Sequence, residues 1–235
     1  MPDYKRLPVR AVLFDLDGTL ADTAPDLAHA ANRVRADRTL APLPLSALRG
    51  YASHGARGLL QAALGVDRGH ADYESLRDAF LGYYGEVLCE RSQLFEGAAD
   101  MLAELDRRGL AWGIVTNKAE RYTLPLVKHL ALHPRSGALI CGDTTPHAKP
   151  HPAPLLAAAK ALGVEPASCV YVGDAERDVT AGIAAGMRTL IARYGYFAPD
   201  EMPERWPADG SIESLAALLD WLPASVAPQQ TRAPF

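Results

Sequence analysis

Two features that many proteins carry are missing from this chain of 235 residues, and each absence excludes a class of partner. No apolar run approaches the roughly 20 residues that a membrane-spanning helix needs. No basic run is longer than a pair, and 28 acidic residues outnumber the 24 basic ones, which gives a formal net charge of −4. Binding to nucleic acid needs concentrated positive charge. We therefore expect neither a membrane nor a nucleic acid as the partner of this protein.

Cysteine is also scarce. Cys89, Cys141 and Cys169 are far apart and odd in number, and no C-x-x-C pair occurs, so neither a disulfide framework nor a zinc knuckle is indicated. Cys141 and Cys169 fall in or beside apolar, strand-like runs, which favours the interpretation that they are small buried side chains. Asp15 comes too early for the apolar segment of a signal peptide. These observations predict a reducing, cytoplasmic environment.

The remaining composition, with 49% hydrophobic and 22% charged residues, is that of an ordinary globular protein. Five short runs are rich in strand-forming residues: 9–14, 111–116, 137–141, 168–172 and 188–192. The segment 98–108 has the apolar stripe of a helix and stops at Gly109, and helix-like segments also separate the last four runs, among them one from Pro152 to Gly163. Apolar runs that alternate with helices are typical of a parallel sheet buried on both faces. The sequence thus predicts a doubly wound α/β fold.

One long segment interrupts this alternation. Residues 22–96 contain no convincing strand, and their patterns predict helices over 26–37, 55–65 and 73–88. We expect an α/β core domain formed by 1–21 and 97–223, a small helical cap domain formed by 22–96, and a disordered tail over 224–235. Because the insertion follows the first strand, it should cover that strand's carboxyl end, where open α/β sheets bind ligands.

Pairs of aspartates follow two of the predicted strands. Asp15 and Asp17 come directly after the first, and Asp174 and Asp178 follow the run 168–172. Asp174 is placed to cap the next helix, and Asp178 lies one helical turn further on. If the two strands are neighbours, the four carboxylates converge, and like charges that close need a cation. Each acid alone has an ordinary structural explanation, but the conjunction favours a site for Mg²⁺, which prefers a few carboxylates together with water and phosphate.

Two further signals occur where such a site would need them. The strand 111–116 ends in Thr116-Asn117-Lys118, and this turn offers a hydroxyl, an amide and backbone N–H groups to anionic oxygens, although alone it would be a plain turn. Lys149 lies beside Pro150, where the stiff backbone would hold its ammonium in place to neutralise a phosphate or a carboxylate. Without the other signals, Lys149 would be interpreted as an exposed loop residue.

These four signals in this order resemble the haloacid dehalogenase superfamily, and within it the phosphoglycolate phosphatase-like group, over about residues 9–222. The resemblance implies that Asp15 attacks a phosphoryl group to form an aspartyl-phosphate. It implies that Asp17 protonates the leaving alcohol and later activates water. Thr116 would hold phosphoryl oxygens, and Lys149 would offset negative charge around Asp15. Asp17 also distinguishes the chain from the dehalogenases of the superfamily, which lack this second acid.

The resemblance further implies how the metal is held. The carboxylates of Asp15 and Asp174 and the main-chain carbonyl of Asp17 would bind Mg²⁺, with Asp178 supporting from nearby. The helical insertion would be the cap that closes over the substrate.

Substrate specificity is expected from the insertion. A glycine-punctuated turn at 50–58 carries His54 and Arg57, and Arg57 suits a bidentate contact with a substrate carboxylate. An ordinary surface arginine is an equally good explanation. The stretches SHGARGLL, SQLFEG, AWGIVTNK and ARYGYFAPDE are similar to the N-acetylmuramic acid 6-phosphate phosphatase branch of the group. The expected substrate is a small phosphorylated metabolite with a carboxylate, such as N-acetylmuramic acid 6-phosphate or 2-phosphoglycolate, contacted by Thr116, Asn117, Lys149, Arg57 and His54.

Two alternatives remain open at this point. A β-phosphoglucomutase-like enzyme of the same superfamily would return the phosphoryl group to a sugar hydroxyl. A catalytically silent binding protein would keep only the fold. The second alternative is disfavoured because inactive relatives usually lose an essential group, and none is missing here.

Overall fold

The computed structural model describes residues 9–225. Its main element is a six-stranded, wholly parallel sheet with the strand order β5-β4-β1-β6-β7-β8. The strands are β1 (Ala11–Phe14), β4 (Ala111–Val115), β5 (Ala138–Ile140), β6 (Cys169–Gly173), β7 (Arg188–Ala192) and β8 (Gly210–Ile212). The five predicted strands are confirmed, and β1 and β6 are neighbours as the convergence of the acids requires.

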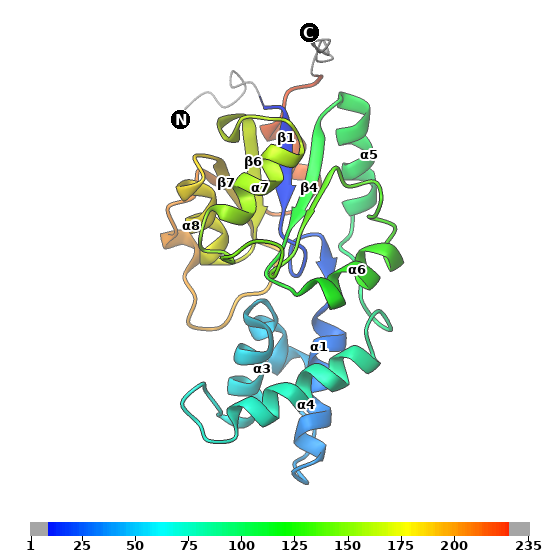
Figure 1. The fold of residues 1–235 in the computed structure, drawn as a ribbon, viewed down its shortest axis with the longest axis vertical. Coiled ribbons are helices and arrows are strands. Elements are labelled where there is room, and N and C mark those ends of the chain that lie inside the picture. The colour runs from blue at the N-terminus through cyan, green and yellow to red at the C-terminus, as the bar shows by residue number, and fades with distance from the viewer. Residues whose placement is uncertain (1–8, 226–235) are drawn as a thin grey trace.

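Helices cover both faces of the sheet, which confirms the doubly wound fold (Figure 1). These helices are α5 (Ala98–Arg108), α6 (Glu120–His129), α7 (Ala153–Ala161) and α8 (Glu176–Ala184). On one face, Leu102 of α5 and Leu126 of α6 pack with Phe14 of β1. On the other face, Leu155 of α7 packs with Leu13 of β1. Burial of one leucine side chain stabilises the folded state by roughly 1.5–3 kcal/mol. Successive residues of β1 thus pack against the helices on opposite faces of the sheet.

The inserted segment forms helices that pack around a hydrophobic cluster of their own. They are α1 (Ala24–Ala36), α2 (Leu45–Leu48), the 3-10 helix η2 (Arg49–His54), α3 (Gly55–Leu64) and α4 (Tyr73–Glu86). Phe80 and Leu59 are buried at their centre. In Figure 1, α1, α3 and α4 lie together at one end of the molecule, beyond the carboxyl ends of the strands. The three predicted helices of this segment are confirmed.

Short strands were missed by the sequence patterns. β2 (Ala21–Asp22) and β3 (Gln93–Leu94) pair antiparallel where the chain enters and leaves the inserted segment, so the expectation of no strand within 22–96 is wrong. The edge strand β8 was also missed. These three strands are two or three residues long and, unlike β5, lie in no apolar run, so no sequence pattern marks them. The remaining elements are the 3-10 helices η3 (Pro166–Ser168), η4 (Pro203–Arg205) and η5 (Ala216–Trp221).

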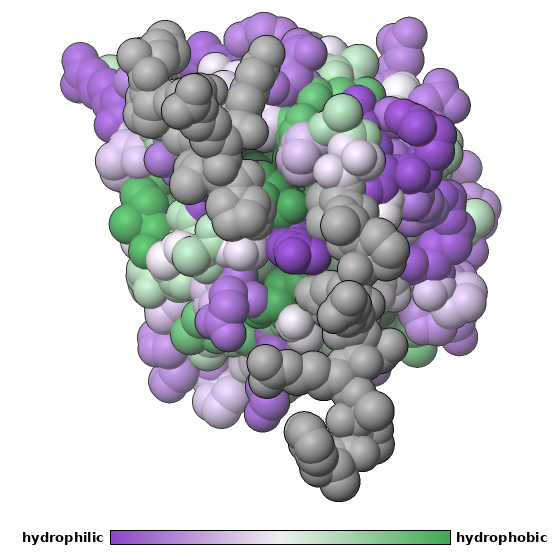
Figure 2. All heavy atoms as spheres, turned by 90° about the horizontal axis from the view of Figure 1, so that it is seen from above, coloured by the Kyte–Doolittle hydropathy of each residue, from purple (hydrophilic) through white to green (hydrophobic). Residues whose placement is uncertain are grey.

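The opposite end of the molecule, where the strands begin, carries hydrophilic side chains over much of its rim with hydrophobic ones between them (Figure 2). Among the described residues, no helix combines the length and hydropathy that crossing a membrane requires. Cys141 and Cys169 are buried and free, as predicted. The predicted tail lies largely outside the described residues, since only 224 and 225 of it are included.

Candidate active site

The site lies at the carboxyl ends of three adjacent strands. Asp15 follows β1, Thr116 follows β4 and Asp174 follows β6, and β1 pairs with both of the other strands. Parallel strands in register deliver the residues that follow them to the same edge of the sheet. All three side chains are buried, with 2% or less of their surface exposed.

Three of the four predicted metal-binding acids are brought together. Asp15, Asp174 and Asp178 each offer a carboxylate oxygen, and these oxygens lie within 4.8 Å of one another. Oδ1 of Asp174 is buried and has no hydrogen-bond partner among the described residues. An unsatisfied carboxylate oxygen beside two other buried carboxylates fits a hard divalent cation such as Mg²⁺. The carboxylate of Asp17 is not part of this cluster, although Asp17 lines the same cavity as Asp15, and its role at the metal stays a prediction.

Burial and mutual repulsion shift the pKa values of these acids. Burial raises the pKa of Asp174 to about 8, and the carboxylates of Asp15 and Asp178 add to the effect. Burial also raises the pKa of Asp15 to about 6, against the opposing effect of the Lys149 ammonium. For Asp178, burial acts to raise the pKa, but the positive charges of Lys149 and Arg177, together with hydrogen bonds from Lys149 and the backbone of Ala175, hold it below its ordinary value. A bound cation would favour the ionised form of all three acids.

The placement of Asp174 differs from the prediction. Helix α8 begins at Glu176 with Ala175 as its N-cap residue, so Asp174 lies one position too early to be the cap. Its Oδ2 instead accepts hydrogen bonds from Ser53 Oγ at 2.6 Å and from the backbone N–H of Tyr196 at 2.9 Å. Gly18 makes room for this carboxylate, because a Cβ there would lie 2.0 Å from Asp174 Oδ2, and the φ of Gly18 is +81°.

Lys149 connects the acids. Its Nζ lies 3.0 Å from Oδ1 of Asp15 and 2.8 Å from Oδ1 of Asp178. It also donates to the carbonyl oxygen of Val115 at 2.8 Å and to the Tyr171 hydroxyl at 2.7 Å. The ammonium is therefore fully partnered and buried, in contrast to an exposed loop lysine.

Asn117 uses its side chain on the loop that carries Lys149. Its Nδ2 donates to the carbonyl oxygen of Lys149 at 2.8 Å, and its Oδ1 accepts from the backbone N–H of Lys149 at 2.9 Å. Both interactions hold the main chain from which the ammonium projects. Asn117 also lines the cavity described below. A direct contact between Asn117 and a substrate stays a prediction.

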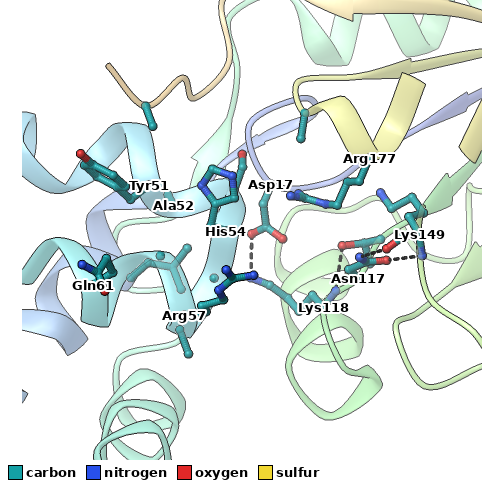
Figure 3. Close-up of a pocket in the computed structure, with 18 of the residues that line it drawn as sticks. Asp17, Tyr51, Ala52, His54, Arg57, Gln61, Asn117, Lys118, Lys149 and Arg177 are labelled. Atoms are coloured by element: carbon teal, nitrogen blue, oxygen red, sulfur yellow. Dashed lines mark hydrogen bonds and ion pairs between the residues drawn. The ribbon is translucent and has the colours of Figure 1, made fainter. Parts of the chain in front are cut away.

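A cavity of about 1110 Å³ opens between the sheet edge and the inserted helices. Asp15, Thr116 and Lys149 line its floor, and His54 and Arg57 line the opposite wall. Figure 3 shows His54 and Arg57 coming from the inserted segment to face side chains of the core. The imidazole of His54 lies 3.4 Å from Glu201 Oε1, so this part of the wall is tied to a core loop. This volume is slightly above the roughly 300–1,000 Å³ of typical ligand pockets.

The sequence analysis assigned no role in the site to several side chains that contact the acids. Lys118 contacts Asp17, Arg177 lies 3.8 Å from Oδ2 of Asp15, and Ser53 bonds Asp174. Arg177 could have been suspected because it lies between Asp174 and Asp178. Lys118 and Ser53 reach partners 101 and 121 residues away, and no local spacing carries that information.

Comparison with known proteins gives consistent names. A family model described as haloacid dehalogenase-like hydrolase matches residues 9–186. An N-acetylmuramic acid 6-phosphate phosphatase from Pseudomonas putida is 43% identical over 205 residues, which cover 87% of this chain and 92% of that protein. A phosphoglycolate phosphatase from Xanthomonas campestris pv. campestris is 44% identical over 216 residues, covering 92% of this chain and 96% of that protein.

Solved structures agree with these relatives. The crystal structure of a "predicted phosphoglycolate phosphatase" from Haemophilus somnus superposes with a TM-score of 0.79 at 26% sequence identity, over 92% of this chain and 98% of that one. The family match spans most of the chain. The curated relatives are phosphatases, and the alignments cover nearly their whole length. This chain therefore belongs to the haloacid dehalogenase-like hydrolase family and is a phosphoric monoester hydrolase.

Proposed function

We propose that the protein is a Mg²⁺-dependent phosphatase that hydrolyses a small, carboxylate-bearing phosphomonoester through an aspartyl-phosphate on Asp15. The observation that carries this proposal is the group of buried carboxylates formed by Asp15, Asp174 and Asp178, with Asp15 also lining the cavity. A carboxylate that can contact both a cation and a ligand in the cavity suits a nucleophile for phosphorus.

The first step forms one bond and breaks one. An oxygen of Asp15 attacks phosphorus, and the bond between phosphorus and the ester oxygen breaks, so that this oxygen keeps the electron pair. Asp17 donates a proton to it and releases an alcohol. Thr116 offers a hydroxyl to the transferred phosphoryl oxygens, and the positive charge of Lys149 offsets the charge that gathers around Asp15.

The second step returns the enzyme to its starting state. Asp17, now ionised, takes a proton from water, whose oxygen attacks phosphorus as the bond to Asp15 breaks. Inorganic phosphate leaves. Splitting the displacement into two steps replaces one high barrier by two lower ones.

The proposed metal site involves the same acids as the proposed reaction. Asp15 and Asp174, with Asp178 nearby and the main-chain carbonyl of Asp17, would hold the cation. When bound, Mg²⁺ supplies positive charge that stabilises the phosphoryl oxygens in the transition state. The unpartnered Oδ1 of Asp174 is the feature of the chain that favours this assignment.

The domain division belongs to the proposal as well. We propose that residues 22–96 act as a cap over a core formed by 1–21 and 97–223. Their separate hydrophobic cluster and their position across the cavity support this role. A cap excludes water from the phosphoryl group and supplies the contacts that select the leaving group.

The substrate is assigned by charge and by the relatives. Arg57 in the cavity wall is suited to a carboxylate on the leaving group. N-acetylmuramic acid 6-phosphate and 2-phosphoglycolate, named for the two groups of relatives, both pair a phosphate with a carboxylate. Because these relatives are phosphatases, water is favoured over a sugar hydroxyl as the final acceptor. The predicted cytoplasmic location accords with substrates of this kind.

The test is phosphate release from a panel of phosphorylated metabolites that includes both carboxylated candidates, with p-nitrophenyl phosphate as the general substrate. Wild-type protein should need Mg²⁺, and Asp15→Asn should lose at least about 10³-fold in activity, since it removes the nucleophile. Full activity of Asp15→Asn, or equal activity with excess chelator, would overturn the proposal.

A further inference from the structure

Asp17 is held through only one of its two carboxylate oxygens. Oδ1 accepts a hydrogen bond from Lys118 Nζ at 2.6 Å and another from the hydroxyl of Thr23. No hydrogen bond joins Oδ2 to another residue within the range 9–225 that the structure describes. Asp17 lines the cavity, and Figure 3 shows its side chain between the inserted helices and Lys118.

Lys118 is itself held by the inserted segment. Its side chain is only 8% exposed. Its Nζ donates to the hydroxyl of Tyr84 at 2.9 Å and lies 4.8 Å from the centre of the Tyr84 ring. Tyr84 belongs to α4, is buried, and packs beside Phe80 and Tyr122. The ammonium therefore bridges a core carboxylate and a helix of the proposed cap.

We propose that Lys118 is a positioning residue for Asp17, and that Tyr84 makes this position depend on α4 lying against the core. The inference rests on the proposed acid–base role of Asp17. Two donors at Oδ1 leave Oδ2 as the oxygen of this carboxyl group that carries the transferred proton. They also stop the group from rotating, so that Oδ2 stays turned toward the cavity.

The three side chains come from different segments of the chain. Asp17 follows β1, Lys118 follows β4 and Tyr84 lies in the last turn of α4. The proton donor is complete only when these segments are together. An arrangement in which closure assembles the catalytic group is a form of induced fit, and it disfavours reaction before the inserted helices close over a substrate.

The test compares two substrates of nearly the same shape, phenyl phosphate and p-nitrophenyl phosphate. Phenolate is a much stronger base than p-nitrophenolate, so release of phenol needs a proton donor far more. The quantity measured is kcat/KM, which reports the steps up to release of the leaving group. A misplaced Asp17 should therefore slow phenyl phosphate selectively, whereas general damage to the site slows both substrates alike.

The variants are Lys118→Met, Lys118→Arg and Tyr84→Phe. Lys118→Met should lower kcat/KM for phenyl phosphate by about 10²-fold, at the low end of what general acid catalysis supplies, with less than about 3-fold loss for p-nitrophenyl phosphate. Lys118→Arg should restore part of the difference because it keeps a cationic donor. Tyr84→Phe, which removes one hydroxyl and keeps the ring, should give a selective loss of about 3- to 10-fold, the size of one hydrogen bond.

The matched control is Tyr83→Phe in the same helix. Its hydroxyl bonds Asp37 Oδ2 at 2.8 Å in an exposed position, so both rates should stay unchanged. Equal losses on the two substrates in folded Lys118→Met and Tyr84→Phe, or no loss in either, would overturn the inference. If Lys118→Met does not fold, Tyr84→Phe and Lys118→Arg decide.

Asp17→Asn in the same assay separates this inference from the proposed function. A selective loss in Asp17→Asn without one in Lys118→Met and Tyr84→Phe rejects the positioning role alone. The absence of a selective loss in Asp17→Asn rejects the acid role of Asp17, and the positioning role with it.

Discussion

The ammonium of Lys149 lies 3.0 Å from Oδ1 of Asp15, and both side chains are almost completely buried. Ion pairs at such depth are maintained by further contacts, and here Lys149 also reaches Asp178, Tyr171 and the carbonyl oxygen of Val115. This contact compensates the negative charge of Asp15, the proposed nucleophile, while Asp15 still lines the cavity.

Removing this ammonium should affect both stability and activity. Lys149→Met leaves the carboxylates of Asp15 and Asp178 buried without their cation, which costs about 3–5 kcal/mol when one partner of a buried pair is lost. Urea unfolding without metal measures the free energy of unfolding. Lys160→Met, at an exposed position in α7, is the matched control and should change it by less than about 0.5 kcal/mol. Equal stability of the two variants would contradict this account of Lys149.

The metal-free protein should lose stability as the pH rises from 5 to 8. Burial raises the pKa of Asp15 to about 6 and that of Asp174 to about 8, both above the ordinary 3.8. The folded state then binds more protons than the unfolded state in this range, so the free energy of unfolding falls as these groups ionise. Urea unfolding at each pH, with chelator present, measures the slope.

Two controls accompany the pH series. Asp174→Asn removes the group with the higher of these two pKa values. The free energy of unfolding should therefore fall less steeply above pH 6 in this variant. Saturating Mg²⁺ should also remove the fall, because the cation binds the ionised carboxylates. The account of these acids is wrong if the metal-free protein becomes more stable from pH 6 to 8 or if Asp174→Asn leaves the slope unchanged.

Arg57 should act on the leaving group and not on the phosphate. Arg57→Ala is expected to raise KM for carboxylated substrates by about 10- to 100-fold, the size of a charge-assisted hydrogen bond. It should leave kcat/KM for p-nitrophenyl phosphate, which has no carboxylate, nearly unchanged. Arg38→Ala, which removes an exposed arginine of the inserted segment, is the control. Equal effects on the two kinds of substrate would remove Arg57 from carboxylate recognition.

The sequence was sufficient for the elements with long, regular patterns. The apolar stripe of α5 predicted a helix, and the apolar run of β1 predicted a strand. Because Asp15 and Asp174 each follow a predicted strand, their proximity could be expected without knowledge of any contact. The two-residue strands β2 and β3 were missed because they depend on pairing with each other. Asp174 was assigned to the helix cap because its real partners, Ser53 and Tyr196, come from distant segments.

The side chains that face the acids from other segments were the hardest to predict. Lys118 stands in the Thr-Asn-Lys turn that the sequence singled out, yet its contact with Asp17 depends on how β4 lies beside β1. Its contact with Tyr84 depends on how the inserted helices meet the core. Contacts of this kind depend on how separate segments pack against each other. No spacing between residues in the sequence indicates such contacts.

Acids from separate parts of the chain come together in the structure, and in our proposal they enclose a divalent cation and leave Asp15 able to accept phosphorus. The most direct test is the melting temperature of wild type, Asp15→Asn and Asp174→Asn with Mg²⁺ and beryllium fluoride, alone and together, since beryllium fluoride mimics a phosphoryl group on an aspartate. We predict that the melting temperature of wild type rises more with both together than with Mg²⁺ alone, that beryllium fluoride alone has no effect, and that neither variant shows this additional rise. An unchanged wild-type protein, or variants that respond as wild type does, would contradict the claim.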